Sequence, residues 1–197
     1  MKRLIILFLL IPSLCYAAEF GWNNTTGDTS TGSYVANWTM VSQFNLPENG
    51  TVSQLSAYIK GTSATCKVKG LIFSNDGTNS TPMTLQGVTN ENAAIVNGTP
   101  AWYNLTFSSP PYLTAGNYSI GWISGGPDVT LYMLNIAGHN LWKDAAQHTT
   151  TLNYNTPGNF NATGVTYANN YVASIFATYT PGNLTGLTQR RRIIDIN

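Results

Sequence analysis

Hydrophobic and polar residues alternate in short segments along most of the chain, over residues 37–179. The segment AWYNLTF, residues 101–107, shows the pattern clearly. Side chains of an extended strand point alternately to its two faces, so Leu105 and Phe107 fall on one side and Trp102 falls on the other. This two-residue period indicates half-buried β-strands.

Turn residues interrupt the alternation at intervals of roughly 8 to 15 residues, which is typical of a sandwich or a barrel. The segments expected to form strands are 37–46, 52–61, 67–73, 83–88, 101–107, 118–123, 129–134, 149–155 and 171–179. Each would have one apolar face, and two packed sheets bury such faces well. The sequence therefore predicts an all-β fold: an antiparallel two-sheet β-sandwich, jelly-roll-like, of about nine strands.

Two local expectations refine this fold. The segments 101–107 and 118–123 are predicted to be adjacent strands, because a turn rich in Ser, Pro and Gly joins them. The segment GHNLWKDAAQH, residues 138–148, is the one candidate for a helix, of two turns at most. Trp142 then lies outside any strand pattern.

The order of four segments resembles jelly-roll-like modules of secreted bacterial and phage surface proteins. These segments are FNLPENGTVSQLSAYIKG, GLIFSNDGTNSTPMTLQGVT, WYNLTFSSPPYLTAGNYSIGWISGG and YVASIFATYTP. The resemblance covers most of residues 44–181, and its motifs are structural: the LTAGNY turn and the closing strand. It implies a β-sandwich used for display or binding outside the cell, and it brings no catalytic residues.

The first 17 residues have the layout of a secretory signal peptide. Lys2 and Arg3 precede an apolar run over 4–14, and small residues lead to a cleavage site after Ala17. The run is far shorter than the roughly 20 apolar residues that span a bilayer, so no membrane span is expected after cleavage. The predicted organisation is a signal peptide at 1–17, a β-sandwich domain at 18–181 and a flexible tail at 182–197. We expect a secreted protein, extracellular or at the cell surface.

One cysteine, Cys66, would remain after this cleavage, so no intrachain disulfide is expected. We interpret Cys66 as a small buried apolar residue, and a disulfide-linked dimer through it stays open.

Charged residues make up only 9% of the chain, against a usual quarter or so. Residues 18–180 contain four lysines and seven acidic residues, and no basic patch that would hold a phosphate backbone. Nucleic acid is therefore not expected as a partner. The polar positions are mostly Asn, Thr, Ser and Gly, which suit hydrogen bonding to neutral, hydroxyl-rich ligands.

Ten Asn-x-Ser/Thr triplets make the chain a candidate glycoprotein. The asparagines are Asn23, Asn24, Asn37, Asn49, Asn79, Asn97, Asn104, Asn117, Asn161 and Asn183. The other interpretation is that strands with Asn and Thr on their wet faces generate such triplets without any modification.

No motif of a known catalytic centre is present. GWISGG, around Ser124, lacks the spacing of a hydrolase nucleophile elbow, and His-Glu-x-x-His is absent. His139 and His148 are nine residues apart, which does not place them on one helical face as metal ligands. Three of the acidic residues stand in turn contexts: Glu48 in LPENG, Asp76 in SNDGTN and Asp128 in GGPDV. The sequence predicts no enzyme, no metal site and no cofactor.

Aromatic residues are the better candidates for a site. They make up 12% of the chain, and several stand in or near the Asn-rich stretch 152–171. A flat ring beside an Asn side chain matches the apolar face and hydroxyl rim of a sugar. The candidate ligand-binding residues are Trp142, Tyr154, Phe160, Tyr167 and Tyr171. Rings that merely cover the edge of the sandwich are the alternative.

These features predict a non-catalytic extracellular binding or adhesion module that recognises carbohydrate, either a glycan or a cell-surface polysaccharide, through loop aromatics and Asn. The alternative is a structural subunit of a surface layer, filament or virion that self-assembles through its C-terminal tail. That tail ends in RRRIIDIN, and Ile193, Ile194 and Ile196 are the residues that would add to a neighbour's sheet. A frayed, solvated tail is the simpler interpretation.

Overall fold

The computed structural model describes residues 16–26, 28–34, 36–62, 66–75, 81–95, 98–126, 129–144, 152–160 and 166–182. All regular elements in these residues are strands, which confirms the predicted all-β class. The strands are β1 (Ala18–Gly21), β2 (Thr29–Tyr34), β3 (Thr39–Leu46), β4 (Gly50–Gly61), β5 (Cys66–Asn75), β6 (Pro82–Val88), β7 (Asn92–Ile95), β8 (Ala101–Thr106), β9 (Tyr112–Leu113), β10 (Gly116–Gly126), β11 (Val129–Asp144), β12 (Thr166–Ala173) and β13 (Ile175–Pro181).

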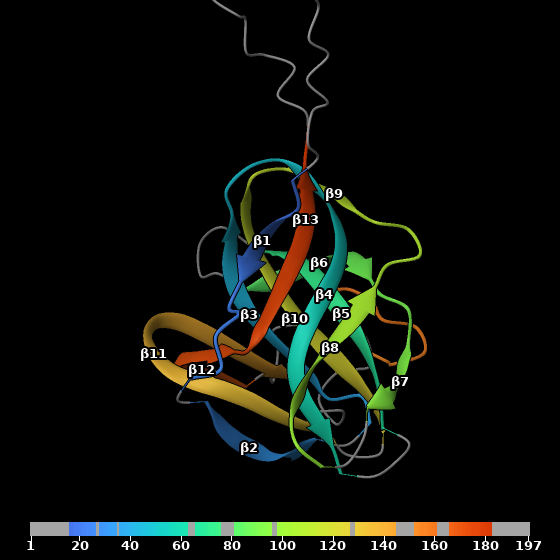
Figure 1. Ribbon diagram of the computed structural model, residues 1–197, viewed down its shortest axis with the longest axis vertical. Helices are drawn as coiled ribbons and strands as arrows, with labels where there is room; N and C mark the ends of the chain where they lie inside the picture. The colour runs from blue at the N-terminus through green and yellow to red at the C-terminus, as the bar shows by residue number, and fades with distance from the viewer. Residues whose placement is uncertain are drawn as a thin grey trace, which may run out of the picture.

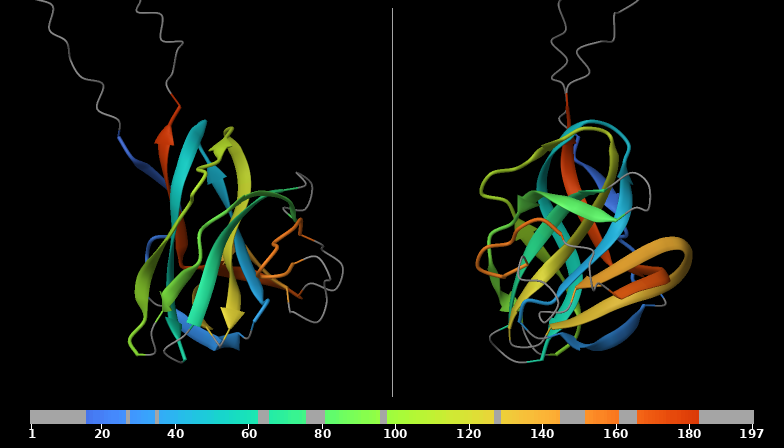
Figure 2. Two further views of the ribbon diagram at one scale, coloured as in Figure 1. Left: turned by 90° about the vertical axis from the view of Figure 1, so that its right-hand side faces the viewer. Right: turned by 180° about the vertical axis from the view of Figure 1, so that it is seen from behind.

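The strands are arranged in two layers. The front sheet has the order β1-β13-β4-β8 and faces the viewer in Figure 1, while the back sheet has the order β3-β10-β5-β6. The left view of Figure 2 shows the two layers edge-on. The shorter strands extend them: β9 pairs with β4, and β7 pairs with β5. All of these pairings are antiparallel, so the sandwich-like architecture agrees with the prediction.

The strand β11 connects the two layers along one side. Its first residues pair with β4 of the front sheet and its last residues pair with β3 of the back sheet. Between them, β11 and β12 form a bent two-stranded arm that projects to the left in Figure 1. The register shifts between Asn135 and Asn140, where Gly138 has a φ of +86°, and Asn170 on β12 has a φ of +63°. These left-handed conformations allow both strands to bend together.

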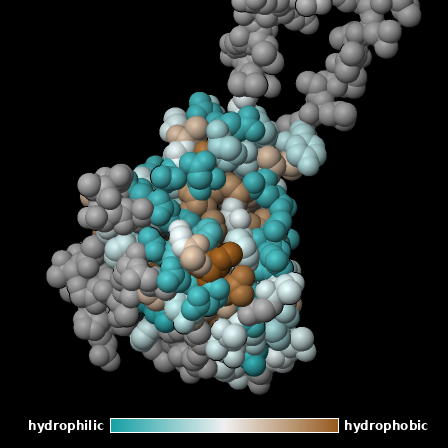
Figure 3. Space-filling model, turned by 90° about the vertical axis from the view of Figure 1, so that its left-hand side faces the viewer, coloured by the Kyte–Doolittle hydropathy of each residue, from teal (hydrophilic) through white to brown (hydrophobic). Residues whose placement is uncertain are grey.

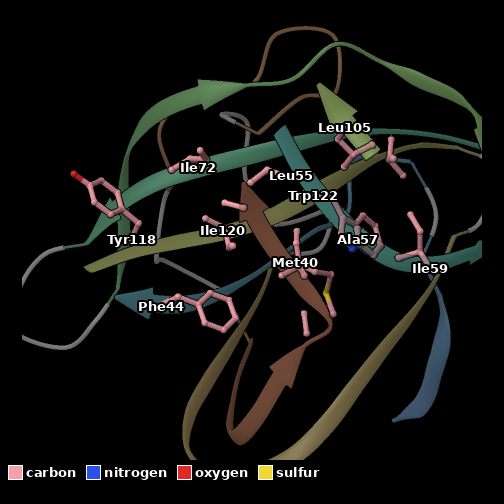
Figure 4. Packing of buried hydrophobic residues seen from close by; sticks show 14 of the residues in the cluster. Met40, Phe44, Leu55, Ala57, Ile59, Ile72, Leu105, Tyr118, Ile120 and Trp122 are labelled. Carbon is pink, nitrogen blue, oxygen red and sulfur yellow. The ribbon is translucent and has the colours of Figure 1, made fainter. Parts of the chain in front are cut away.

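The inward faces of the two sheets supply the main core (Figure 4). Leu55 comes from the front sheet, and Met40, Ile120 and Trp122 come from the back sheet, all with at most 1% of their surface exposed. Cys66 is fully buried in the same core, as expected. Each large apolar side chain removed from water contributes roughly 1.5–3 kcal/mol, so the alternation seen in the sequence stabilises this two-layer packing.

The back sheet brings the backbones of β10 and β3 unusually close at Gly121. A Cβ atom at this position would lie 1.8 Å from the carbonyl oxygen of Met40 and 2.6 Å from Cγ1 of Val41. Only glycine fits here, because no side chain can occupy space already taken by a neighbouring backbone.

The predicted helix at 138–148 is wrong in the part that the structure describes. Residues 138–144 belong to β11, and Trp142 pairs with Val41 on one side and Tyr167 on the other. The pattern misled because the arm is bent and its bulge breaks the two-residue period. His139 also lies in this strand, and His148 lies outside the described residues.

Three strand predictions also need correction. The segments 101–107 and 118–123 are not adjacent, because β8 pairs with β4 and β10 pairs with β3 and β5. The segment 171–179 is divided at Ser174 into β12 and β13, which pair with different strands. In 149–155, the described residues make one isolated bridge, Leu152 with Pro157, in place of a strand. The described strands exceed the nine expected because bends and short edge strands divide the pattern further.

Candidate functional site

The front sheet carries a group of aromatic side chains on its outer face. Tyr58 on β4 and Trp102 on β8 are direct cross-strand partners. Ala57 and Ile59, on either side of Tyr58, are fully buried, and Tyr103, next to Trp102, packs against the main core. Phe176 on β13 and Tyr132 on β11 join them from the other side of β4. All four are partly exposed. We call Tyr58, Trp102, Tyr132 and Phe176 the aromatic patch.

The rings of the aromatic patch touch one another in a continuous chain. Ring centroids are 5.3 Å apart for Tyr132 and Tyr58, 5.4 Å apart for Tyr58 and Trp102, and 5.1 Å apart for Trp102 and Phe176. The corresponding interplanar angles are 67°, 49° and 67°. Such tilted and edge-to-face contacts stabilise aromatic pairs by about 0.5–1.5 kcal/mol beyond their burial.

Small polar residues adjoin the aromatic patch on the same face. Ser56 on β4 pairs with Asn104 of β8 and Phe176 of β13, and its Oγ donates a hydrogen bond of 2.8 Å to Asn104 Oδ1. One step further along the strands, Gln54 pairs with Thr106 and with Thr178. The outer face of the front sheet therefore offers exposed ring surface next to amide and hydroxyl groups.

Three of the five residues predicted to bind a ligand lie together on the outer face of the back sheet: Trp142, Tyr154 and Phe160. The segment 152–160, orange in Figure 2, packs there and forms a second apolar cluster. The members of this back-sheet cluster are Val41, Leu71, Phe73, Ile123, Leu152, Tyr154 and Phe160, with Leu85, Val88 and Trp142 packed against it. Tyr154 and Phe160 are only 6% and 7% exposed. Neither presents a free ring face to a ligand.

Tyr154 is held in this cluster by polar contacts. Its hydroxyl donates to Glu91 Oε2 at 3.0 Å, and Lys69 Nζ donates to its carbonyl oxygen at 3.0 Å and lies 4.6 Å from its ring centroid. The ring packs directly over Gly125, where a Cβ would come within 2.6 Å of it. Lys67 forms an ion pair with Glu91 at 3.2 Å. These contacts attach the segment 152–160 to the sheet.

The same contacts shift the ionisation of both partners. Burial, and then the hydrogen bond to and charge of Glu91, raise the pKa of the Tyr154 hydroxyl well above its ordinary value. Burial raises the pKa of Glu91, but hydrogen bonds from Tyr154 and Lys67 and the charges of Lys67 and Lys69 outweigh it, and the net shift is downward. The structure therefore keeps a neutral phenol donating to an ionised carboxylate.

The remaining predicted site residues lie elsewhere. Tyr171 pairs with Asn135 in the arm and packs against the main core. The backbone of Tyr167 pairs with that of Trp142. Ile193, Ile194 and Ile196 lie outside the described residues.

The described part of the chain groups no three His, Cys, Asp or Glu side chains that could hold a metal ion. His139 contacts aromatic rings: its centroid lies 5.8 Å from that of Trp22 and 6.1 Å from that of Phe44. Asp28 accepts a hydrogen bond from Ser174 Oγ, next to the break between β12 and β13. Burial raises the pKa of Asp28, and this hydrogen bond partly opposes the shift.

A separate apolar patch lies on the side of the molecule that bears β1, β3 and the arm. Figure 3 shows it as a brown hollow with a polar rim. Partly buried apolar residues of these elements and the adjoining loop are Ala18, Trp22, Leu134 and Ile136. The indole Nε1 of Trp22 is buried and meets no hydrogen-bond acceptor among the described residues.

The sequence contains one signal for the aromatic patch. In both β4 and β8 the alternation places an aromatic residue, Tyr58 or Trp102, in the phase opposite to the core residues. Alternation alone does not show that these positions share a surface, because it does not say which strands lie side by side. No protein-family model matches this sequence, and no curated protein sequence is significantly similar to it.

Proposed function

We propose that this protein is a non-catalytic extracellular binding module that recognises carbohydrate through the aromatic patch on its front sheet. The observation that carries the proposal is the continuous contact of four partly exposed rings, Tyr132, Tyr58, Trp102 and Phe176, on the outer face of a sheet. Exposed aromatic surface gathered in one place is a common mark of a binding site, because a ligand that covers it removes apolar surface from water.

Sugar chemistry fits this surface. The C–H face of a pyranose is apolar and stacks on an aromatic ring, while its rim of hydroxyls needs donors and acceptors. Asn104 is exposed two residues from Trp102 on the same strand, and Gln54 and Thr106 continue the polar surface. Side chains with both donor and acceptor groups suit hydroxyls well. The low content of charged residues favours a neutral glycan over a highly charged one.

The position of the site supports a role in adhesion or display. The strand β4 is paired on both edges over most of its length. The front sheet is therefore a rigid platform. A rigid platform loses little conformational entropy on binding.

An extracellular location is inferred from the signal-peptide layout and from the resemblance to secreted surface modules. The structure has no apolar helix, within its described residues, that would be long enough to cross a bilayer.

A glycan and polysaccharide array tests the proposal, probed with the purified protein and with Trp102→Ala and Tyr58→Ala. We expect a selective signal from the wild type and a loss of roughly tenfold or more in affinity for each variant. The matched control is Tyr112→Ala, which removes a ring that is 60% exposed. Tyr112 pairs with Thr51, seven residues from Tyr58 along β4, or roughly 23 Å away.

Two outcomes would contradict the proposal. One is a blank array with a folded wild-type protein. The other is binding that survives Trp102→Ala but is lost in Trp142→Ala, which would return the site to the residues first predicted from the sequence. Near-ultraviolet circular dichroism of each variant shows that a loss of binding is not a loss of fold.

A second candidate function is self-assembly by strand addition, and a specific observation favours it. β13 is the only strand that pairs with β1 in the described residues, so the other edge of β1 offers unpaired backbone groups beside the apolar hollow of Figure 3. Trp22 follows β1 directly, and its buried indole Nε1 meets no acceptor among the described residues, which costs roughly 1–3 kcal/mol. The occupant would be the segment around Ile193, Ile194 and Ile196 of a neighbouring copy.

Light scattering of the full chain and of a chain ending at Gly182 tests this second candidate. Assembly through the tail predicts oligomers of the full chain and monomers of the shortened one. A monomeric full chain would exclude it.

A further inference from the structure

We infer that the aromatic patch takes a single soluble glycan chain lying across the strands, and not the flat surface of a crystalline polysaccharide. This inference rests on the proposed function of the patch and specifies the form of its ligand. It follows from the orientation of the rings and from their order on the sheet.

The orientation of the rings excludes a flat platform. A crystalline polysaccharide presents parallel chains in one plane, and stacking on several chains at once needs rings that share a plane. No contacting pair of the patch does so: the interplanar angles are 67° for Tyr132 and Tyr58, 49° for Tyr58 and Trp102, and 67° for Trp102 and Phe176. Only a chain whose sugar units turn relative to one another can place successive units against successive rings.

The order of the rings gives the direction of the chain. Tyr58 and Trp102 are cross-strand partners on β4 and β8. On the other edge of β4, β11 pairs with it through Leu131 and Ile59, and Tyr132 is the next residue of β11. Tyr132, Tyr58 and Trp102 therefore form a row perpendicular to the strands. Phe176 stands outside this row, beside Ser56.

The polar groups flank this row on one side and a single charge flanks it on the other. Asn104 follows Trp102 by two residues on β8, whereas Lys60 follows Tyr58 by two residues on β4, in the opposite direction across the sheet. A chain along the row would have its ring faces on the aromatics and its hydroxyl edges beside Asn104 and Lys60. Contacts to both edges favour an isolated chain, because neighbouring chains in a crystal cover those edges.

Two measurements test the inference. The first compares soluble glycans on the array with sedimentation on crystalline cellulose and crystalline chitin. We expect Trp102-dependent binding to a soluble glycan and no binding to either solid. Trp102-dependent binding to a solid, with a blank array, would overturn this inference and leave the carbohydrate-binding function standing. No binding in either format would overturn both.

The second measurement is a chain-length series, from one to six units, of the glycan that gives the strongest array signal. We expect affinity to rise up to about the length that spans the three rings and then to level off. Tyr132→Ala removes the ring at one end, so it should lower affinity for long chains about tenfold and for a single unit less than twofold. Full affinity for a single unit would overturn the inference, since it would indicate a pocket for one sugar. Tyr112→Ala serves again as the control and should follow the wild-type curve.

Discussion

Trp102 and Phe176 touch edge to face, with ring centroids 5.1 Å apart, although their strands are separated by β4. The contact forms above Ser56, the β4 residue that pairs directly with Phe176. A serine side chain is short enough to leave room for the two rings to meet. The aromatic patch therefore depends on a small residue that is itself 1% exposed.

Enlarging Ser56 should separate these rings. We expect Ser56→Leu to displace Trp102 or Phe176 and to reduce glycan affinity about tenfold, while Ser56→Ala leaves affinity within about threefold. The alanine variant loses only the hydrogen bond to Asn104, worth about 1 kcal/mol of unfolding free energy. Titration calorimetry measures the affinities, and near-ultraviolet circular dichroism reports the aromatic packing. Equal affinities for the leucine and alanine variants would show that the ring contact is not needed.

Tyr154 should contribute to stability and not to binding. Its hydroxyl donates to Glu91, so Tyr154→Phe should lower the free energy of unfolding by about 1 kcal/mol while the apolar cluster stays intact. Urea denaturation measures this change, and Tyr112→Phe, at an exposed position, should show almost none. Glycan affinity should be the same in all three proteins. Reduced affinity in Tyr154→Phe would mean that the back-sheet cluster takes part in recognition.

Gly121→Ala should prevent normal packing of β10 against β3. The added methyl group would lie 1.8 Å from the carbonyl oxygen of Met40, which belongs to the backbone of the neighbouring strand and cannot rotate away. We expect a loss of about 3 kcal/mol or more, or failure to accumulate folded protein. Asn117→Ala on the same strand is the control, because its side chain is exposed, and it should cost less than about 1 kcal/mol. A Gly121 variant as stable as that control would mean that the two strands are further apart than described.

Asp28 should make stability depend on pH. Its pKa in the folded protein is raised, chiefly by burial, so above about pH 4 the folded state holds this proton more tightly than the unfolded chain does. The contribution of this group to stability is therefore complete at low pH and is lost as the pH rises through the raised pKa. Asn cannot titrate, so the difference in stability between Asp28→Asn and the wild type should shift in favour of the variant from pH 3 to pH 7. Urea midpoints across this range measure it; a constant difference would contradict the assigned shift.

The sequence by itself determined the class of the fold and, in the segment 101–107, the side that faces the core. Alternation is a local property, so Leu105 and Phe107 were assigned to the core and Trp102 to the opposite face without any knowledge of neighbours. Where the backbone bends, local reasoning failed. The bulge before Trp142 breaks the two-residue period, so the local pattern predicts a helix where the structure has a strand.

The tertiary structure alone decided where the aromatic residues lie relative to one another. The patch joins Tyr58, Trp102, Tyr132 and Phe176, which come from four strands and are up to 118 positions apart, the difference between 176 and 58. Tyr154 was expected in a binding loop, but it is buried because the outer face of the back sheet has apolar residues to cover. Local sequence determines which face of its strand a residue occupies. Pairing between distant strands determines which residues share that face. The order of the strands is set by the burial of all the apolar faces at once, and local sequence does not contain that information.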